Sequence, residues 1–135
     1  MLAPVKEEKR TVSLSLEDEK WLSKALNAEE IKDIDISDMK VKATDLMLMA
    51  LGYCFGITIQ AYTNHKGYKI EDVKIEVIGE KHPKENRYER LSINVSFKSD
   101  LTEEQITRVM EIGKRGCTVG NTLEKGAIIE KKYIG

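Results

Sequence analysis

The chain has 135 residues, enough for one compact domain whose core needs no disulfide support. Its 22 lysines and arginines balance 23 aspartates and glutamates, and the net charge of -1 argues against nucleic acid or anionic lipid as a partner. Residues 1–10 become charged within a few positions and lack the apolar stretch of a secretory signal, so a cytoplasmic protein is expected.

The N-terminal part, residues 1–42, carries weak structural signals. Residues 12–16 alternate apolar and polar side chains, which is typical of a half-buried strand. Residues 17–27 place apolar side chains at helical spacing and predict a short helix, and two isoleucines in residues 34–36 indicate another short strand.

The most apolar part of the chain, residues 46–59, predicts a long central helix that begins near Thr44 and stops at Gly67. Its 14 residues are fewer than the roughly 20 that cross a bilayer, so we expect a helix buried in protein and no membrane partner. Gly52 and Gly56 lie about one turn apart. They either admit a close neighbouring helix or merely relieve crowding.

The chain after Gly67 predicts a modest α+β domain. Residues 73–77 and 91–97 alternate as two antiparallel strands, joined by an exposed polar connection over residues 79–87. Thr102 and Gln105 form a capping box that begins a helix, and this helix is expected to end at two glycines. The glycines are Gly113 and Gly116, and a new helical turn over residues 118–123 and a last strand over residues 127–134 should follow them.

Two cysteines are the only thiols of the chain. Cys54 lies within the apolar helix, and Cys117 falls at the start of the turn over residues 118–123. At a helix start, free amides and the helix dipole favour a thiolate, and Lys114 with Arg115 would add positive charge. The two thiols are either fillers of a core or the two ends of a redox couple, whose disulfide would be transient in a reducing cytosol.

Metal chemistry is not expected from this sequence. His65 and His82 lie far apart in polar surroundings and have no nearby ligand at the short spacing that zinc sites use. We therefore expect no bound metal and no bound cofactor.

Three segments follow one another in an order that resembles the OsmC/Ohr family of osmotically inducible and organic hydroperoxide resistance proteins. They are the apolar helix over residues 45–54, the paired strands over residues 70–97 and the run Cys117-Thr118-Val119-Gly120-Asn121-Thr122-Leu123. The similarity covers residues 43–134 and is much poorer over residues 1–42. It implies one OsmC-like domain over residues 1–135, with an antiparallel sheet wrapped around a long central helix in an intertwined homodimer.

The resemblance also implies a thiol-dependent peroxidase of the stress response that reduces organic hydroperoxides. Cys54 would attack the peroxide and become a sulfenic acid, and Cys117 would resolve it as a disulfide that an external dithiol reopens. Family members pair a glutamate with an arginine beside the reactive thiolate. Asp45 occupies the position of that glutamate, and Arg10 would supply the charge unless a lysine such as Lys40 or Lys42 replaces it.

A second function stays open beside the enzyme. The chain departs from the family pattern at Ala43 and Thr118, where the family commonly has prolines, and a lysine lacks the planar fork that arginine offers. The alternative is an OsmC-fold dimer without robust peroxidase activity. Such a dimer would bind a small hydrophobic molecule in an apolar cleft beside Cys54, or act as a thiol redox sensor.

Overall fold

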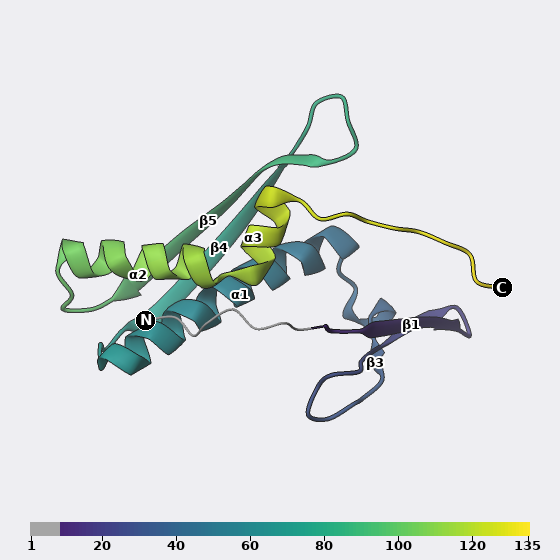
Figure 1. Cartoon of the computed structure of the whole chain (residues 1–135), viewed down its shortest axis with the longest axis horizontal. Helices are drawn as coiled ribbons and strands as arrows, with labels where there is room; N and C mark the ends of the chain where they lie inside the picture. Colours follow the sequence, from purple (N-terminus) through teal and green to yellow (C-terminus); the bar gives the residue numbers. More distant parts are fainter. Residues whose placement is uncertain (1–8) are drawn as a thin grey trace. The chain divides into compact units, whose positions relative to one another are not determined.

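The computed structural model describes residues 9–135; residues 1–8, on which most of the expectation about a secretory signal falls, lie outside the described part. The described chain divides into two compact units, residues 9–46 and residues 47–135. Antiparallel strands and three α-helices make up these units, so the expected α+β class is confirmed (Figure 1).

The N-terminal unit is a small antiparallel sheet. Its strands are β1 (Val12–Glu17), β2 (Lys20–Ala25) and β3 (Ile34–Asp35) in that order, and the 3-10 helix η1 (Ser37–Met39) follows. The two short strands predicted in this part of the sequence are therefore confirmed.

The helix predicted over residues 17–27 is wrong, because a tight turn folds this segment back as strand β2. Asp18 and Glu19 have positive φ angles of 49° and 63°, the left-handed conformation that both central residues of a two-residue hairpin turn of type I′ require. Leu16 then pairs with Trp21 across the two strands. The apolar spacing in this segment is helical, and the turn with its strand pairing overrides it.

Strand β1 has no cover on its apolar side within the described chain. Val12, Leu14 and Leu16 are 58%, 55% and 58% exposed. The half-buried state expected for this strand is therefore wrong for a single chain, although its alternating pattern is real.

The long helix α1 (Ala43–Lys66) confirms the predicted central helix. Thr44 lies inside the helix and is not its N-cap, because the helix already begins at Ala43. The carboxylate of Asp45 instead accepts a hydrogen bond from the backbone N–H of Lys42 at 2.9 Å and so satisfies one of the free amides at the helix start. Gly67, with a φ of 72°, ends the helix as predicted.

Helix α1 is long and apolar enough, by its 24 residues and their composition, to cross a membrane. The expectation of a segment too short for this is wrong, because the helix extends beyond the 14 most apolar residues at both ends. The core helix of a soluble protein meets the same criterion, and one face of α1 is buried against other parts of residues 47–135.

A long hairpin covers one side of this helix. Strands β4 (Glu71–Lys81) and β5 (Tyr88–Lys98) pair antiparallel, which confirms the two predicted strands, and the connection is limited to residues 82–87. A Cβ atom added at Gly52 would lie 2.9 Å from Val77, and one at Gly56 would lie 3.1 Å from Ile75. These two glycines therefore admit a strand, and no second helix, close to the backbone of α1.

Helix α2 (Glu103–Gly116) starts at the predicted capping box. Thr102 accepts a hydrogen bond from the N–H of Gln105 at 3.1 Å, and the side chain of Gln105 accepts one from the N–H of Thr102 at 2.9 Å. The prediction that Gly113 ends the helix is wrong, because α2 continues to Gly116, the second glycine expected at its end. A Cβ atom at Gly113 would lie 2.6 Å from Phe55, so this glycine allows α2 to approach α1 closely.

The short helix α3 (Thr118–Lys125) follows Cys117 as expected. The strand predicted over residues 127–134 is wrong, since these residues run as an extended segment without strand pairing. Its apolar side chains are open to solvent, with Ile128 91% and Tyr133 93% exposed. A segment rich in apolar residues does not form a strand when no strand edge in residues 9–135 pairs with it.

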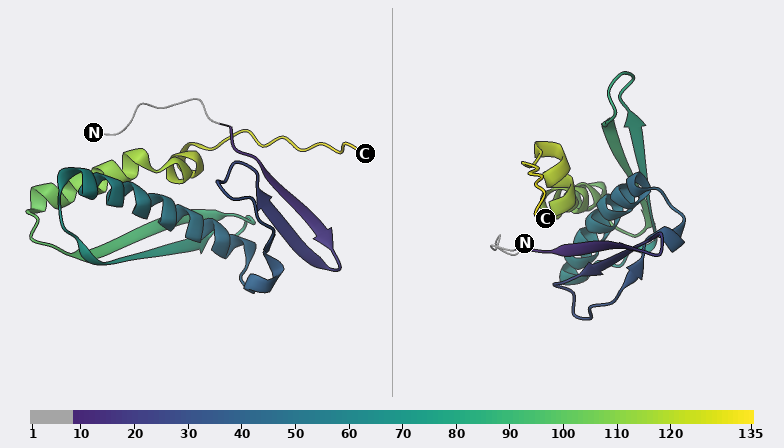
Figure 2. Two further views of the ribbon diagram at one scale, coloured as in Figure 1. Left: turned by 90° about the horizontal axis from the view of Figure 1, so that it is seen from below. Right: turned by 90° about the vertical axis from the view of Figure 1, so that its right-hand side faces the viewer.

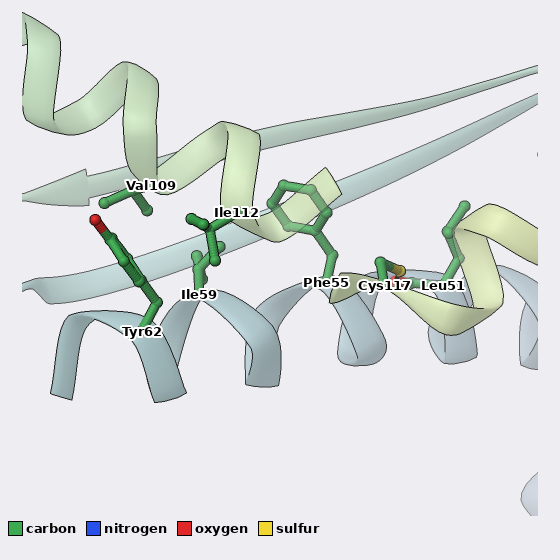
Figure 3. Packing of buried hydrophobic residues seen from close by; sticks show 7 residues of the cluster. All are labelled: Leu51, Phe55, Ile59, Tyr62, Val109, Ile112 and Cys117. Carbon is green, nitrogen blue, oxygen red and sulfur yellow. Dashed lines mark hydrogen bonds between the residues drawn. The ribbon is translucent and has the colours of Figure 1, made fainter. Parts of the chain in front are cut away.

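The core of the larger unit lies between α1 and α2, which occupy the same face of the hairpin (Figures 1 and 2). Its fully buried centre consists of Ile59, Val109 and Ile112 (Figure 3). Each such side chain contributes about 1.5–3 kcal/mol through burial. This core fixes α1 against the end of α2, and Cys117 belongs to the same cluster.

Candidate functional site

The fold brings the two cysteines together although they are 63 positions apart in the sequence. Both are free thiols, Cys54 half-buried on α1 and Cys117 buried between α2 and α3. They lie close enough for the Cys54 thiol to contribute, by a hydrogen bond and by its charge, to the raised pKa of Cys117. Residues from two separate helical segments thus form one thiol pair.

Burial sets the state of Cys117. Desolvation raises its pKa above that of an ordinary thiol, and the backbone N–H groups of Gly120 and Val119 lower it by less. The expectation that the helix start and its neighbouring basic residues favour a thiolate here is therefore wrong. Instead, Cys117 Sγ accepts from the N–H of Gly120 at 3.3 Å and its S–H donates to the carbonyl of Leu51 at 3.9 Å, contacts that suit a neutral thiol.

Thr58 joins the two cysteine segments, and the sequence reasoning missed it. Its hydroxyl donates to the carbonyl oxygen of Cys54 at 2.8 Å and to the carbonyl oxygen of Gly116 at 3.3 Å. The hydroxyl therefore bonds back within α1 and also reaches across to the residue before Cys117. The sequence offers one indication of this role, a threonine inside a predicted helix four positions after a cysteine, where its hydroxyl can donate to the carbonyl of that cysteine.

Asp45 and Arg10 belong to the N-terminal unit, so the structure does not place them in the thiol pair. Asp45 caps the start of α1, as described above. Arg10 donates from its guanidinium to the carbonyl oxygen of Asn27 at 3.3 Å. Their roles beside a reactive thiolate stay predictions.

A pocket of about 420 Å³ opens on Cys117. Both apolar and polar side chains line it. We call this cavity the Cys117 pocket. Its lining residues are Leu51, Phe55, Tyr88, Glu89, Leu91, Ile93, Lys114, Cys117, Gly120, Asn121, Leu123 and Glu124. Its volume falls within the range of sites for small organic molecules, about 300–1,000 Å³.

A larger groove of about 910 Å³ runs between α1 and β4. Its apolar lining includes Met49, Ile57, Val73 and Ile75, and Cys54 is not among its lining residues. This α1–β4 groove is therefore distinct from the Cys117 pocket. It offers a second place for an apolar molecule.

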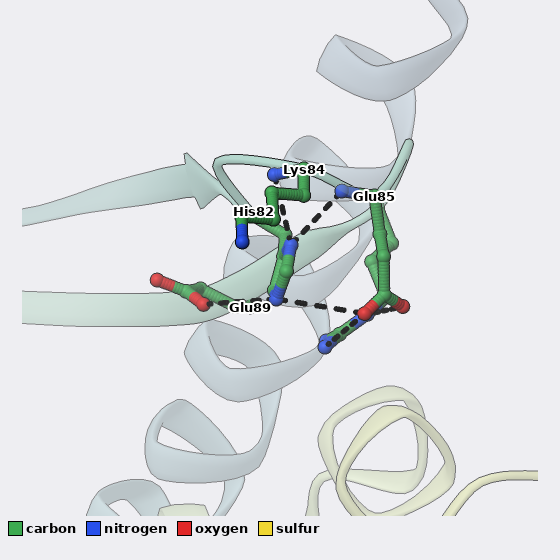
Figure 4. A network of polar contacts seen from close by, with 5 residues as sticks. His82, Lys84, Glu85 and Glu89 are labelled. Carbon is green, nitrogen blue, oxygen red and sulfur yellow. Dashed lines mark hydrogen bonds and ion pairs between the residues drawn. The ribbon is translucent and has the colours of Figure 1, made fainter.

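His82 contacts several residues in and beside the loop between β4 and β5 (Figure 4). Its Nδ1 atom accepts from the N–H groups of Lys84 at 3.1 Å and Glu85 at 2.9 Å. Its Nε2 atom lies 3.5 Å from Glu85 and 3.9 Å from Glu89. The ring thus connects residues within the loop between β4 and β5. Within residues 9–135, no three His, Cys, Asp or Glu side chains lie together as a metal site.

Comparison with known proteins agrees with the fold and the order of the motifs. The family model described as OsmC-like protein matches residues 36–132. No curated protein matches the chain.

Several solved structures share the fold at low sequence identity. A hypothetical protein from Aquifex aeolicus VF5 is 21% identical with a TM-score of 0.70, over 88% of this chain and 89% of that one. An OsmC-like protein from Mycoplasma pneumoniae is 15% identical with a TM-score of 0.69, over 88% and 89%. An OsmC-like hydroperoxide resistance protein from Jannaschia sp. CCS1 is 15% identical with a TM-score of 0.59, over 92% and 91%. Since the family model spans well over half of the sequence, this chain belongs to the OsmC-like protein family.

Proposed function

We propose that this protein is a thiol-dependent peroxidase that reduces organic hydroperoxides through Cys54 and Cys117. One observation carries the proposal: two thiols from distant segments lie close together in the fold, near enough for Cys54 to contribute to the raised pKa of Cys117. The hydroperoxide resistance protein from Jannaschia sp. CCS1, which has the same fold, adds support.

The difference between the two thiols suits a two-step reaction. The Cys54 thiolate attacks one peroxide oxygen, the O–O bond breaks, and the alcohol leaves after taking a proton, so that Cys54 becomes a sulfenic acid. The Cys117 thiol then attacks this sulfur, the S–O bond breaks, and water leaves as the disulfide forms. A buried thiol with a raised pKa is a poor first nucleophile, and this supports giving the first step to the more exposed Cys54 in the proposed reaction.

The thiolate at Cys54 needs a stabilising cation. We assign this role to Arg10, oriented by the carboxylate of Asp45, as the family resemblance implies. A bidentate guanidinium can hold a carboxylate and a thiolate at once, whereas the ammonium group of Lys40 or Lys42 cannot.

The working form is a homodimer in which the sheets of the two chains wrap around the central helices. Met49, Tyr53 and Ile57 repeat every four positions along α1 and are 52%, 73% and 44% exposed. An apolar stripe of this kind on a long helix is typical of a surface that a partner covers. A second copy of the chain is the partner that this proposal names.

The alternative function, binding of a small hydrophobic molecule without robust peroxidase activity, is favoured by the α1–β4 groove. Met49, Tyr53 and Ile57 line this groove and also belong to the surface proposed for the second copy, so a ligand bound here would lie against the partner chain. The lining of the groove is largely apolar and includes neither cysteine, so a ligand could bind there with no redox step. A fluorescent apolar probe should then bind with equal affinity to the wild type and to a Cys54→Ser, Cys117→Ser double variant.

Peroxide consumption tests the proposed function. Purified protein with a dithiol reductant should consume cumene hydroperoxide, and Cys54→Ser should abolish this activity. Cys117→Ser should still react once with peroxide but then accumulate the sulfenic and sulfinic acids of Cys54. Wild-type protein that is folded yet no more active than Cys54→Ser would refute the enzyme and leave the binding function.

A further inference from the structure

The Cys117 pocket gives one sulfur of the proposed pair its own route to solvent. Cys117 is only 2% exposed, yet it lines this pocket, and Cys54 is not among the lining residues. A molecule that enters here meets Cys117. The pocket therefore distinguishes between the two sulfurs of a disulfide.

A glycine keeps the approach to this sulfur open. A Cβ atom added at Gly120 would lie 3.2 Å from Cys117 Sγ and 3.4 Å from Leu51 Cδ1. The contact with the sulfur is tight and the one with Leu51 is an ordinary van der Waals contact, so a side chain at this position would crowd the space beside the sulfur. The same glycine donates its N–H to the sulfur at 3.3 Å.

The lining indicates the kind of molecule that fits. Leu51, Phe55, Leu91, Ile93 and Leu123 give apolar walls that suit a short hydrocarbon chain. Two carboxylates, Glu89 and Glu124, and one ammonium, Lys114, give the pocket an excess of negative charge. An uncharged thiol on an apolar chain is therefore favoured over an anionic thiol such as glutathione.

We propose that the external dithiol reopens the disulfide by entering the Cys117 pocket and attacking Cys117, an inference that rests on the proposed Cys54–Cys117 redox pair. The dithiol thiolate forms a bond to Cys117 Sγ, the bond between the two cysteines breaks, and Cys54 leaves as a thiolate. The second thiol of the reductant then attacks its own sulfur in the mixed disulfide and forms a cyclic disulfide. Cys117 leaves with both electrons and takes up a proton, so the dithiol is oxidised and the protein is reduced.

Mapping of the mixed disulfide tests this route. The wild-type protein is oxidised either with one equivalent of cumene hydroperoxide or with diamide, and then receives a brief pulse of butanethiol. Acid quenching, alkylation with N-ethylmaleimide and peptide mass spectrometry follow. The expected product carries the butylthio group on Cys117 and the maleimide on Cys54, and a butylthio group mainly on Cys54 would overturn the route.

The two oxidants separate this inference from the proposed function. If diamide forms the disulfide but peroxide does not, the peroxidase is refuted, while butylthio labelling of Cys117 still supports the route. If neither oxidant forms the disulfide, both proposals are overturned.

A pocket-filling variant gives a second measurement. Gly120→Val should slow reduction of the diamide-formed disulfide by 1,4-butanedithiol about tenfold, equivalent to about 1.4 kcal/mol. Thr122→Val is the matched control, because it places the same side chain at an exposed position of α3 outside the pocket lining. Equal rates for a folded Gly120→Val and the control would contradict entry through the pocket.

Discussion

Replacement of Thr58 by valine tests how the fold holds the two cysteines in reach of each other. The hydroxyl of Thr58 donates to the carbonyl of the residue before Cys117 and to that of Cys54, so it fixes the segment that carries Cys117, the proposed resolving thiol. Valine keeps the branched shape but cannot donate a hydrogen bond. In Thr58→Val we expect the protein to fold and the disulfide to form more slowly.

The size of the effect follows from one hydrogen bond. A hydrogen bond between uncharged groups contributes about 1 kcal/mol net, and loss of this amount would lower the population of the close arrangement about fivefold. Resolution of the sulfenic acid competes with a second attack by peroxide. At a fixed peroxide concentration, the ratio of sulfinic acid on Cys54 to disulfide should therefore rise about fivefold.

Intact-mass spectrometry after a graded peroxide pulse measures this ratio directly. Thr58→Ser is the control, since it keeps the hydroxyl and should give the wild-type ratio. A merely structural loss would lower the melting temperature without changing the ratio. If Thr58→Val gives the wild-type ratio in folded protein, or if serine behaves like valine, Thr58 does not position the pair.

Three other substitutions or conditions test the packing, the thiol and the dimer. Gly113→Ala should destabilise the fold by about 1–3 kcal/mol in urea unfolding, because its Cβ would lie 2.6 Å from the ring of Phe55; an unchanged midpoint would disprove the close approach. Burial raises the pKa of Cys117, so as the pH rises the unfolded chain loses this proton before the folded chain does. The free energy of unfolding, compared with that of Cys117→Ser, should therefore fall as the pH rises above the ordinary thiol pKa. A difference between the two proteins that stays constant with pH would contradict the burial argument. Tyr53→Glu should shift the protein from dimer to monomer in analytical ultracentrifugation, whereas Thr107→Glu on α2 should not; dimeric Tyr53→Glu would argue against the α1 stripe as the interface.

Local signals in the sequence predicted the larger unit well. The capping box at Thr102, the stop at Gly67 and the alternation in β4 and β5 each depend on neighbouring residues, and each was confirmed. Elements with ambiguous local patterns were predicted less well. Strand β2 has helical apolar spacing, and only the left-handed turn at residues 18 and 19 commits it to a strand.

Predictions were wrong where the role of a residue depends on contacts with residues that are distant in sequence. Gly113 is typical of a helix end by its local sequence. Its structural role is instead to leave room for Phe55, which is distant in sequence and approaches Gly113 only in the folded chain. Cys117 looked like an activated thiol at a helix start, but burial by residues of α1 outweighs the local amides. Thr58 had no obvious partner in the sequence, because that partner lies on α2.

The surroundings of Cys117 explain why its neighbour, and not Cys117, should meet the peroxide first. An attacking thiol must be ionised before the reaction begins, whereas a resolving thiol needs to lose its proton only as water departs. The carbonyl of Leu51 accepts from the thiol of Cys117 and the N–H of Gly120 donates to its sulfur, contacts that suit a neutral thiol, and in the proposed cycle a neutral thiol would resist direct oxidation. In the disulfide the sulfur of Cys117 carries no proton, and it lines a pocket large enough for a small thiol. In the proposed cycle, burial would thus delay Cys117 in the oxidative step and leave it available in the reductive one, so one residue would serve both halves of the cycle in the right order.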